Sequence, residues 1–250
     1  MGIIAIFCFA YTSLAAQEIK QDVLLNDALM LLKFRKDQAA LVDFEKILSQ
    51  HPDNLDALWG KAEVLRRARH YKEAESMLNE ILKKDPKHIP SLISLAHMRY
   101  KEDSLNEALR LIRQVLDADC PDKENRALAY VILGGIKSRY ASKGGLLCKI
   151  KYGPGIKSYF LQAKELAPDL PEMHLALGSF YLLAPKIIGG NLEKAIKELE
   201  YTIKIAPDFA TANARLAQCY KKKGDLEKCN FYLNRAKELD PANEVLQELK

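Results

Sequence analysis

The fold is decided by residues 207–241, which read PDFATANARLAQCYKKKGDLEKCNFYLNRAKELDP. Two apolar stretches with helical spacing flank Gly224 and Asp225, a pair that favours the end of one helix and the start of the next. Pro207 and Pro241 bound the segment and lie 34 residues apart. The segment therefore predicts two helices joined by a short turn, with a proline at the boundary of each unit.

The same interval recurs earlier in the chain, where Pro52 and Pro86 are also 34 residues apart. Three alanines keep this spacing, and each is followed four residues later by a large apolar side chain: the pairs are Ala40 and Phe44, Ala74 and Leu78, and Ala108 and Ile112. A small residue lets two helices approach closely, and a bulky neighbour fills the space beside the crossing. Self-similarity at this period predicts a solenoid of helix hairpins.

The pattern resembles the tetratricopeptide-repeat (TPR) family, whose period is 34 residues. In the last unit the family positions are held by Leu216, Ala217, Tyr220, Gly224, Leu233, Ala236 and Pro241, with Cys229 in place of the usual alanine. The resemblance implies an all-α, single right-handed superhelix of six hairpins with a capping helix over residues 242–250. The hairpins are expected at about residues 22–53, 54–87, 88–121, 122–169, 170–208 and 209–241.

Helix ends should follow from local capping signals. Ser104 and Glu107 form a predicted capping box in front of Ala108, and Asn191 and Asp225 are predicted N-caps of the second helices of their units. Gly144 is expected to end a long helix that starts near residue 124.

Two insertions interrupt the regular spacing. The fourth unit has ten extra residues centred on 143–155, and the fifth has five extra that form an expanded turn over 185–190. Residues 127–164 contain no acidic side chain but seven lysines and arginines, in a chain whose net charge is only +5. We therefore expect Lys143, Lys149 and Lys151 to form an exposed basic contact for an acidic peptide or an anionic surface. The alternative is a solvated loop with no partner.

The resemblance also implies which residues face a partner, because the first helix of each TPR hairpin lines the concave groove. By position, the groove residues would be Trp59, Arg66, Arg67, His97, Tyr100, Lys101, Arg139, Gln218, Lys221 and Lys222. Aromatic residues and arginine are enriched in binding hot spots, although Trp59 could instead fill a gap between units. The resulting prediction is a non-enzymatic scaffold that binds a protein or peptide.

Enzyme chemistry and cofactors are not predicted. The five histidines form no pair at the one-turn spacing of a helical metal site, so no metal and no cofactor are expected.

A second, local resemblance supplies the alternative function. Residues 174–195, with Ala184-Pro185 and Gly189-Gly190, are similar to the TPR-type T components of bacterial TRAP solute transporters, which implies a bacterial envelope protein and an accessory role in transport.

The N-terminal segment differs from the rest of the chain, because residues 2–16 carry no charge. Its apolar run and the small residues at 13–16 predict a signal peptide over residues 1–16 and export to the periplasm or envelope. A misplaced start codon or an N-terminal anchor remains an alternative. Export disfavours nucleic acid as a partner.

In an oxidising compartment Cys219 and Cys229 could form a disulfide, although two buried thiols are the alternative.

Overall fold

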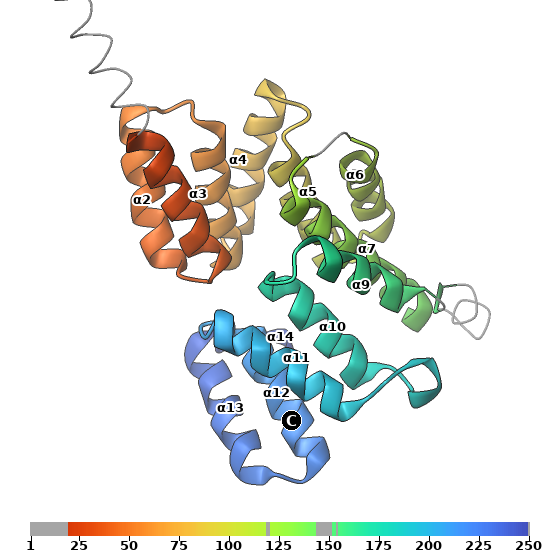
Figure 1. The fold of residues 1–250 in the computed structure, drawn as a ribbon. Helices are drawn as coiled ribbons and strands as arrows, with labels where there is room; N and C mark the ends of the chain where they lie inside the picture. The colour runs from red at the N-terminus through yellow and green to blue at the C-terminus, as the bar shows by residue number, and fades with distance from the viewer. Residues whose placement is uncertain (1–19, 119–120, 144–151, 154, 250) are drawn as a thin grey trace, which may run out of the picture. The chain divides into compact units, whose positions relative to one another are not determined.

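The computed structural model describes residues 20–118, 121–143, 152–153 and 155–249. Within these residues the regular structure is helical, and successive helices pack as antiparallel pairs joined by turns (Figure 1). The predicted all-α class with a repeated helix hairpin is thus confirmed. No helix in this part of the chain is both long and apolar enough to cross a membrane.

The helices pair in the order of the sequence. A helix over residues 20–33 pairs with α2 (Asp37–Gln50), α3 (Leu55–Arg67) with α4 (Tyr71–Lys84), α5 (Ile89–Lys101) with α6 (Leu105–Asp117), and α7 (Lys123–Lys143) with α9 (Ile156–Leu166). The pairs α10 (Pro171–Leu183) with α11 (Leu192–Ile205) and α12 (Ala210–Lys223) with α13 (Leu226–Leu239) follow. The short 3-10 helix η1 (Lys186–Ile188) lies between α10 and α11, and α14 (Glu244–Gln247) follows α13.

Contacts divide the chain after Pro86 into two compact units. Unit 1 contains the helices up to α4, and its main core cluster surrounds Phe44. Unit 2 contains α5 to α14, with a core cluster that includes Leu177, Leu199 and Leu216. The 34-residue period does not indicate this division, because the proline at position 86 is equivalent to the prolines at the ends of other repeats.

The predicted small and large residues are all buried at the helix crossings. Ala40, Ala74 and Ala108 are 0% exposed, as are the bulky side chains Phe44, Leu78 and Ile112 that follow them. Gly60 of α3 shows how closely the helices approach, because a Cβ atom there would lie within 2.5 Å of three ring carbons of Phe44. This close contact explains the glycine on sterics alone.

The turns between paired helices share one backbone feature. Arg35, Arg69 and Asp103 have left-handed φ angles of 66°, 69° and 66°, and they follow one another at the repeat interval. Gly224 holds the turn between α12 and α13 with φ 83°. Left-handed geometry is unfavourable for residues with a Cβ, so three turns depend on their flanking helices to hold a shape that glycine adopts readily.

Two of the three predicted side-chain caps are present. The Asn191 carboxamide oxygen accepts a hydrogen bond from the Lys194 amide at 2.9 Å, and the Asp225 carboxylate accepts one from Lys228 at 3.0 Å. The capping box at Ser104 is wrong, because its hydroxyl makes no capping bond. Its amide donates to the Arg99 carbonyl instead, and the Arg99 guanidinium lies 3.2 Å from the Glu107 carboxylate that should have completed the box.

The cysteines of the last pair are free thiols. Cys219 of α12 and Cys229 of α13 are both buried and unpaired, so the predicted alternative of two buried thiols holds and the disulfide does not. Burial raises the pKa of the Cys219 thiol to about 12, and the neighbouring cations Lys222 and Arg215 only partly oppose it. Cys120 and Cys148 lie outside the described residues, as does the predicted signal peptide.

Candidate functional site

The candidate groove residues fall into both units, and those of unit 1 lie on α3. Trp59 is half-buried and packs against the core cluster around Phe44, as expected of a residue that fills a gap. Arg66 and Arg67 follow at the end of the same helix. Their side chains are only 12% and 11% exposed.

Both arginines are held inside unit 1 by the buried carboxylate of Glu63. Arg66 donates from Nε and Nη2 to the two Glu63 oxygens at 2.8 and 2.5 Å. Arg67 donates to Glu63 at 3.1 Å and also reaches the Leu32 carbonyl and the Asp37 carboxylate, each at 2.7 Å. A buried ion pair orients its members and leaves little net charge. Arg67 therefore links α3 to the first hairpin, whereas the bonds of Arg66 to Glu63 stay within α3, and a role for either arginine in partner binding stays a prediction.

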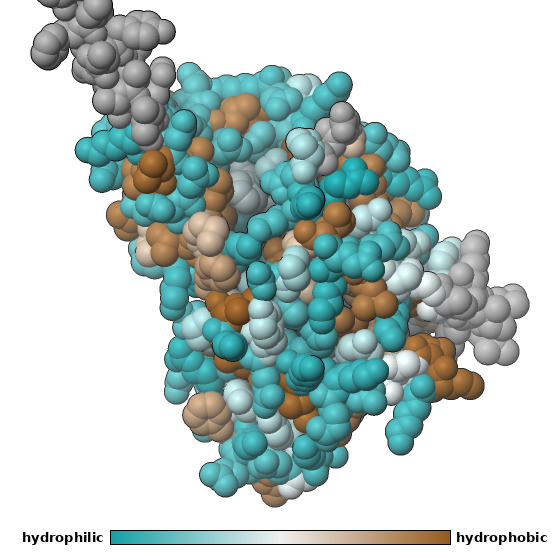
Figure 2. All heavy atoms as spheres, in the orientation of Figure 1, coloured by the Kyte–Doolittle hydropathy of each residue, from teal (hydrophilic) through white to brown (hydrophobic). Residues whose placement is uncertain are grey.

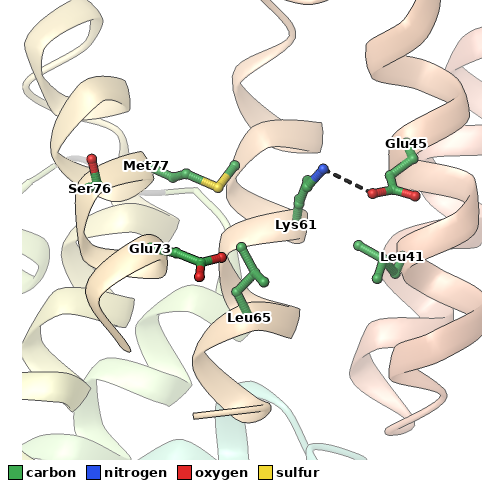
Figure 3. Close-up of a pocket in the computed structure, with 7 residues that line it drawn as sticks. All are labelled: Leu41, Glu45, Lys61, Leu65, Glu73, Ser76 and Met77. Atoms are coloured by element: carbon green, nitrogen blue, oxygen red, sulfur yellow. Dashed lines mark hydrogen bonds and ion pairs between the residues drawn. The ribbon is translucent and has the colours of Figure 1, made fainter. Parts of the chain in front are cut away.

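Unit 1 also has an open pocket of about 540 Å³ between α2, α3 and α4 (Figure 3). Leu41, Leu65 and Met77 supply apolar walls, while Lys61 pairs with Glu45 at 2.9 Å across it. Glu73 and Ser76 complete the lining. None of the predicted groove residues lines this pocket, so it does not coincide with the expected site.

In unit 2 the predicted residues of α5 and α7 lie together. The Arg139 guanidinium stacks over the Tyr100 ring at 5.2 Å, and the His97 ring centroid is 6.3 Å from that of Tyr100. Arg139 also lies 3.6 Å from the Asp103 carboxylate. Lys101 extends to the far end of the chain and donates to the Glu244 carboxylate at 2.6 Å.

The predicted residues of α12 reach the same C-terminal segment. Gln218 donates to the Glu248 carboxylate at 3.0 Å, and Lys221 donates to the Leu249 carbonyl at 2.9 Å. Lys222 does not join them: its ammonium donates to the Leu182 carbonyl at 3.1 Å near the end of α10. That contact satisfies a carbonyl at a helix C-terminus, so Lys222 lies apart from the other α12 residues, and its role in partner binding stays a prediction.

Arg215 is the residue that the sequence prediction missed. Its guanidinium donates to both Glu248 oxygens, at 2.7 and 3.4 Å, and also to the Gln218 side chain at 2.7 Å. Its position three residues before Gln218 places it on the same helix face, so the spacing could have identified it.

Groups from α7 and α12 both act on the Glu248 carboxylate. Burial raises the pKa of Glu248, but the bonds from Gln218 and Arg215 and the positive charges of Arg215 and Arg139 more than reverse this, and the net pKa lies below the ordinary value of 4.5. We call Tyr100, Lys101, Arg139, Arg215, Gln218 and Lys221 the α5–α7–α12 surface. It combines side chains from helices of three repeats, four of which are cationic.

A second perturbed carboxyl, Glu198, lies on α11. Burial raises its pKa, but hydrogen bonds from His174 at 2.6 Å and Lys164 at 2.7 Å reverse the effect, and the net pKa is lowered. His174 is 4% exposed and its other ring nitrogen lies 2.6 Å from the Pro168 carbonyl. This network links α9, α10 and α11, with His174 buried and Lys164 partly exposed.

The predicted basic insertion is described only at its edges. Lys143, the last residue of α7, pairs with the Asp103 carboxylate. Lys149 and Lys151 lie outside the described residues. At the other edge, Tyr152 stacks on Tyr140 with centroids 5.3 Å apart, and the Lys137 ammonium lies 5.3 Å from the Tyr152 ring.

The remaining surface has a mixed character. Figure 2 shows hydrophilic side chains over most of the face in view, with apolar residues scattered among them. In the part of the chain that the structure describes, no three His, Cys, Asp or Glu side chains are grouped as metal ligands.

Comparison with known families decides the relationship. The tetratricopeptide-repeat family model matches residues 31–97 and 187–250, just over half of the chain. The chain belongs to the TPR family. Proteins of this family are generally protein-interaction modules and are typically non-enzymatic. The repeat resemblance of the sequence is thus confirmed, while nothing in the comparisons bears on TRAP transporters.

Individual relatives are distant. The chain is 26% identical over 209 residues to the DnaJ homolog subfamily C member 7 homolog of Dictyostelium discoideum. The aligned region covers 84% of this TPR chain but only 38% of that protein. Among solved structures, a TPR protein from Parabacteroides merdae is similar with a TM-score of 0.55 and 16% identity, over 92% of this chain and 82% of that one. The human IFIT1 dimer with PPP-AAAA gives a TM-score of 0.60 and 17% identity, over 92% and 52% of the two chains. At these identities the structural likeness shows the fold alone.

Proposed function

We propose that this TPR protein is a non-enzymatic scaffold that binds a segment of another protein on the α5–α7–α12 surface. The observation that carries the proposal is that this surface already holds peptide chain, because Lys101, Gln218, Arg215 and Lys221 contact residues 244–249 through side chains and a backbone carbonyl. Groups that come from two repeats, with the charge of Arg139 from a third, converge on one peptide segment, which is what a repeat scaffold needs for recognition.

Capture from the native host tests this proposal. The bait is the full chain, compared with a Lys101→Glu, Arg139→Glu, Lys221→Glu variant. A matched control carries Lys197→Glu, Lys204→Glu and Lys237→Glu, which change the charge equally at exposed positions of α11 and α13. Proteins held by the wild type and by the control should be lost from the first variant, while its helical content is unchanged. An identical set of captured proteins for all three baits would contradict the proposal.

We infer in addition that the basic insertion is a second contact. Reversing Lys143, Lys149 and Lys151 to glutamate should weaken binding to the captured partner or to anionic vesicles, and the wild-type interaction should fall as salt rises. Binding that ignores both charge and salt would reduce the insertion to a solvated loop.

Export to the periplasm or envelope is also proposed, from the uncharged residues 2–16. Mass spectrometry of the protein from its native host should find a chain that begins near residue 16 or 17. An intact N-terminal methionine on cytoplasmic material would contradict export.

The accessory role in solute transport depends only on residues 174–195. In the structure, a Cβ atom on Gly190 would collide with the Ala184 backbone. One glycine of this motif is therefore explained by local packing, and the scaffold proposal remains the better supported of the two.

A further inference from the structure

We propose that the α5–α7–α12 surface is a docking site for an acidic, amphipathic helical segment of the partner protein, and that residues 243–249 of this chain occupy it until the partner displaces them. The inference rests on the proposed function, because it names the partner chemistry and the competitor for the same site.

Charge complementarity defines the acidic requirement. Glu244 and Glu248 are four residues apart, and they contact different helices: Glu244 pairs with Lys101 of α5, while Glu248 accepts from Arg215 and Gln218 of α12. Arg139 of α7 adds its positive charge beside Glu248. Two carboxylates one helical turn apart therefore match cationic groups from both sides of the surface.

Apolar contacts define the second requirement. Val245, Leu246 and Leu249 are 5%, 8% and 9% exposed and belong to the core cluster of unit 2. The Asn243 carboxamide donates to the Thr211 hydroxyl at 3.0 Å, which anchors the start of the segment on α12. In this segment an acidic residue precedes an apolar one twice, as Glu244-Val245 and, four residues later, as Glu248-Leu249. A partner segment would need the same pattern.

The chain's own segment is a weak occupant. The helical part, α14, has only four residues, and a helix of one turn has little stability of its own. Its ion pairs are half-exposed, since the side chains of Glu244 and Glu248 are 58% and 49% exposed, so solvent screens them.

Cationic groups also outnumber the carboxylates that they meet. Lys101, Arg139, Arg215 and Lys221 face three carboxylates, those of Glu244, Glu248 and Asp103, and Lys221 donates to the carbonyl of Leu249 rather than to an acidic side chain. A longer acidic helix could offer Lys221 a carboxylate and thereby outcompete the segment that is present.

The test uses the full chain and a labelled synthetic peptide with the sequence of residues 241–250, PANEVLQELK. The variant Glu244→Gln, Glu248→Gln retains the apolar residues of the segment, so the end of the solenoid stays covered, and its melting curve serves as a check on folding. Fluorescence anisotropy then measures peptide binding to the wild type and to the variant.

We expect the variant to bind the peptide about fivefold more tightly, because its own segment competes less. Adding Lys101→Glu and Arg215→Glu to the variant should abolish binding, and a peptide with both glutamates replaced by glutamine should bind poorly to all forms. Peptide affinity that is equal in wild type and variant, or that survives the two charge reversals, would overturn the inference.

Two further results separate this inference from the proposed function. If native partners depend on Lys101, Arg139 and Lys221 but the peptide does not bind, the scaffold proposal stands and the acidic-helix assignment is wrong. If light scattering shows a dimer that is lost in the Glu244→Gln, Glu248→Gln variant, the occupant is the same segment of a second copy, and the assignment to a different protein is overturned.

Discussion

Replacing Gly60 with alanine gives a sharp test of the helix packing in unit 1. The new methyl group would lie within 2.5 Å of three ring carbons of Phe44, a side chain that is 0% exposed. The ring cannot move into solvent, so the helices must separate. Overpacking of this kind costs about 1–3 kcal/mol, and so close an approach belongs in the upper half of that range. Alanine returns about 1 kcal/mol through its higher helix propensity.

The expected net loss is therefore about 1–2 kcal/mol, which lowers the midpoint of a unit of this size by about 4–8 °C per kcal/mol. Thermal unfolding followed by circular dichroism at 222 nm measures it. Gly135→Ala is the matched control, because its Cβ would lie 3.3 Å from the nearest atom of the half-buried Tyr100 ring. That variant should melt at or slightly above the wild-type temperature. A Gly60→Ala protein that melts as high as the Gly135→Ala protein would refute the packing argument.

Three other changes have defined outcomes. Ala74→Leu should destabilise the protein by about 1–3 kcal/mol because the alanine is fully buried, whereas Ala74→Ser should be tolerated. A leucine variant that melts at the wild-type temperature would show that the repeat register is wrong. Cys219 should resist iodoacetamide at pH 8 in the native protein and react after denaturation, since burial raises its pKa to about 12; peptide mapping by mass spectrometry distinguishes the two. Glu198 has a lowered pKa, so its contribution is present above the ordinary value of 4.5 and is lost as pH falls through the folded value. Glu198→Gln should therefore lower the melting temperature at pH 7 by more than at pH 3, and a constant difference would contradict this.

Much of the fold was predictable because repeat packing is local. The alanines at positions 40, 74 and 108 are fully buried, as their spacing alone predicted. Gly144, the predicted end of α7, lies outside the described residues, so its role stays a prediction. The capping box at Ser104 failed for an equally local reason, since Arg99 competes for its members.

The candidate site was less predictable, because it depends on contacts between distant parts of the chain. Lys101 and Glu244 are 143 residues apart in sequence, and they meet only because α5 to α14 fold into one unit. The pattern within one repeat does not specify how successive repeats curve. Burial of Glu63 was equally invisible in the sequence, although its carboxylate accepts hydrogen bonds from both Arg66 and Arg67.

The expanded turn between α10 and α11 has a practical consequence. It contains η1 and exposes Ile187 almost completely, yet Ala195 and Leu199 beyond it are 0% exposed, like their counterparts in units without an insertion. Lengthening this connection thus leaves the crossing of its two helices intact. The turn is a permissive position at which a tag, a fluorophore or a foreign epitope could be displayed while the flanking helices continue to pack as before.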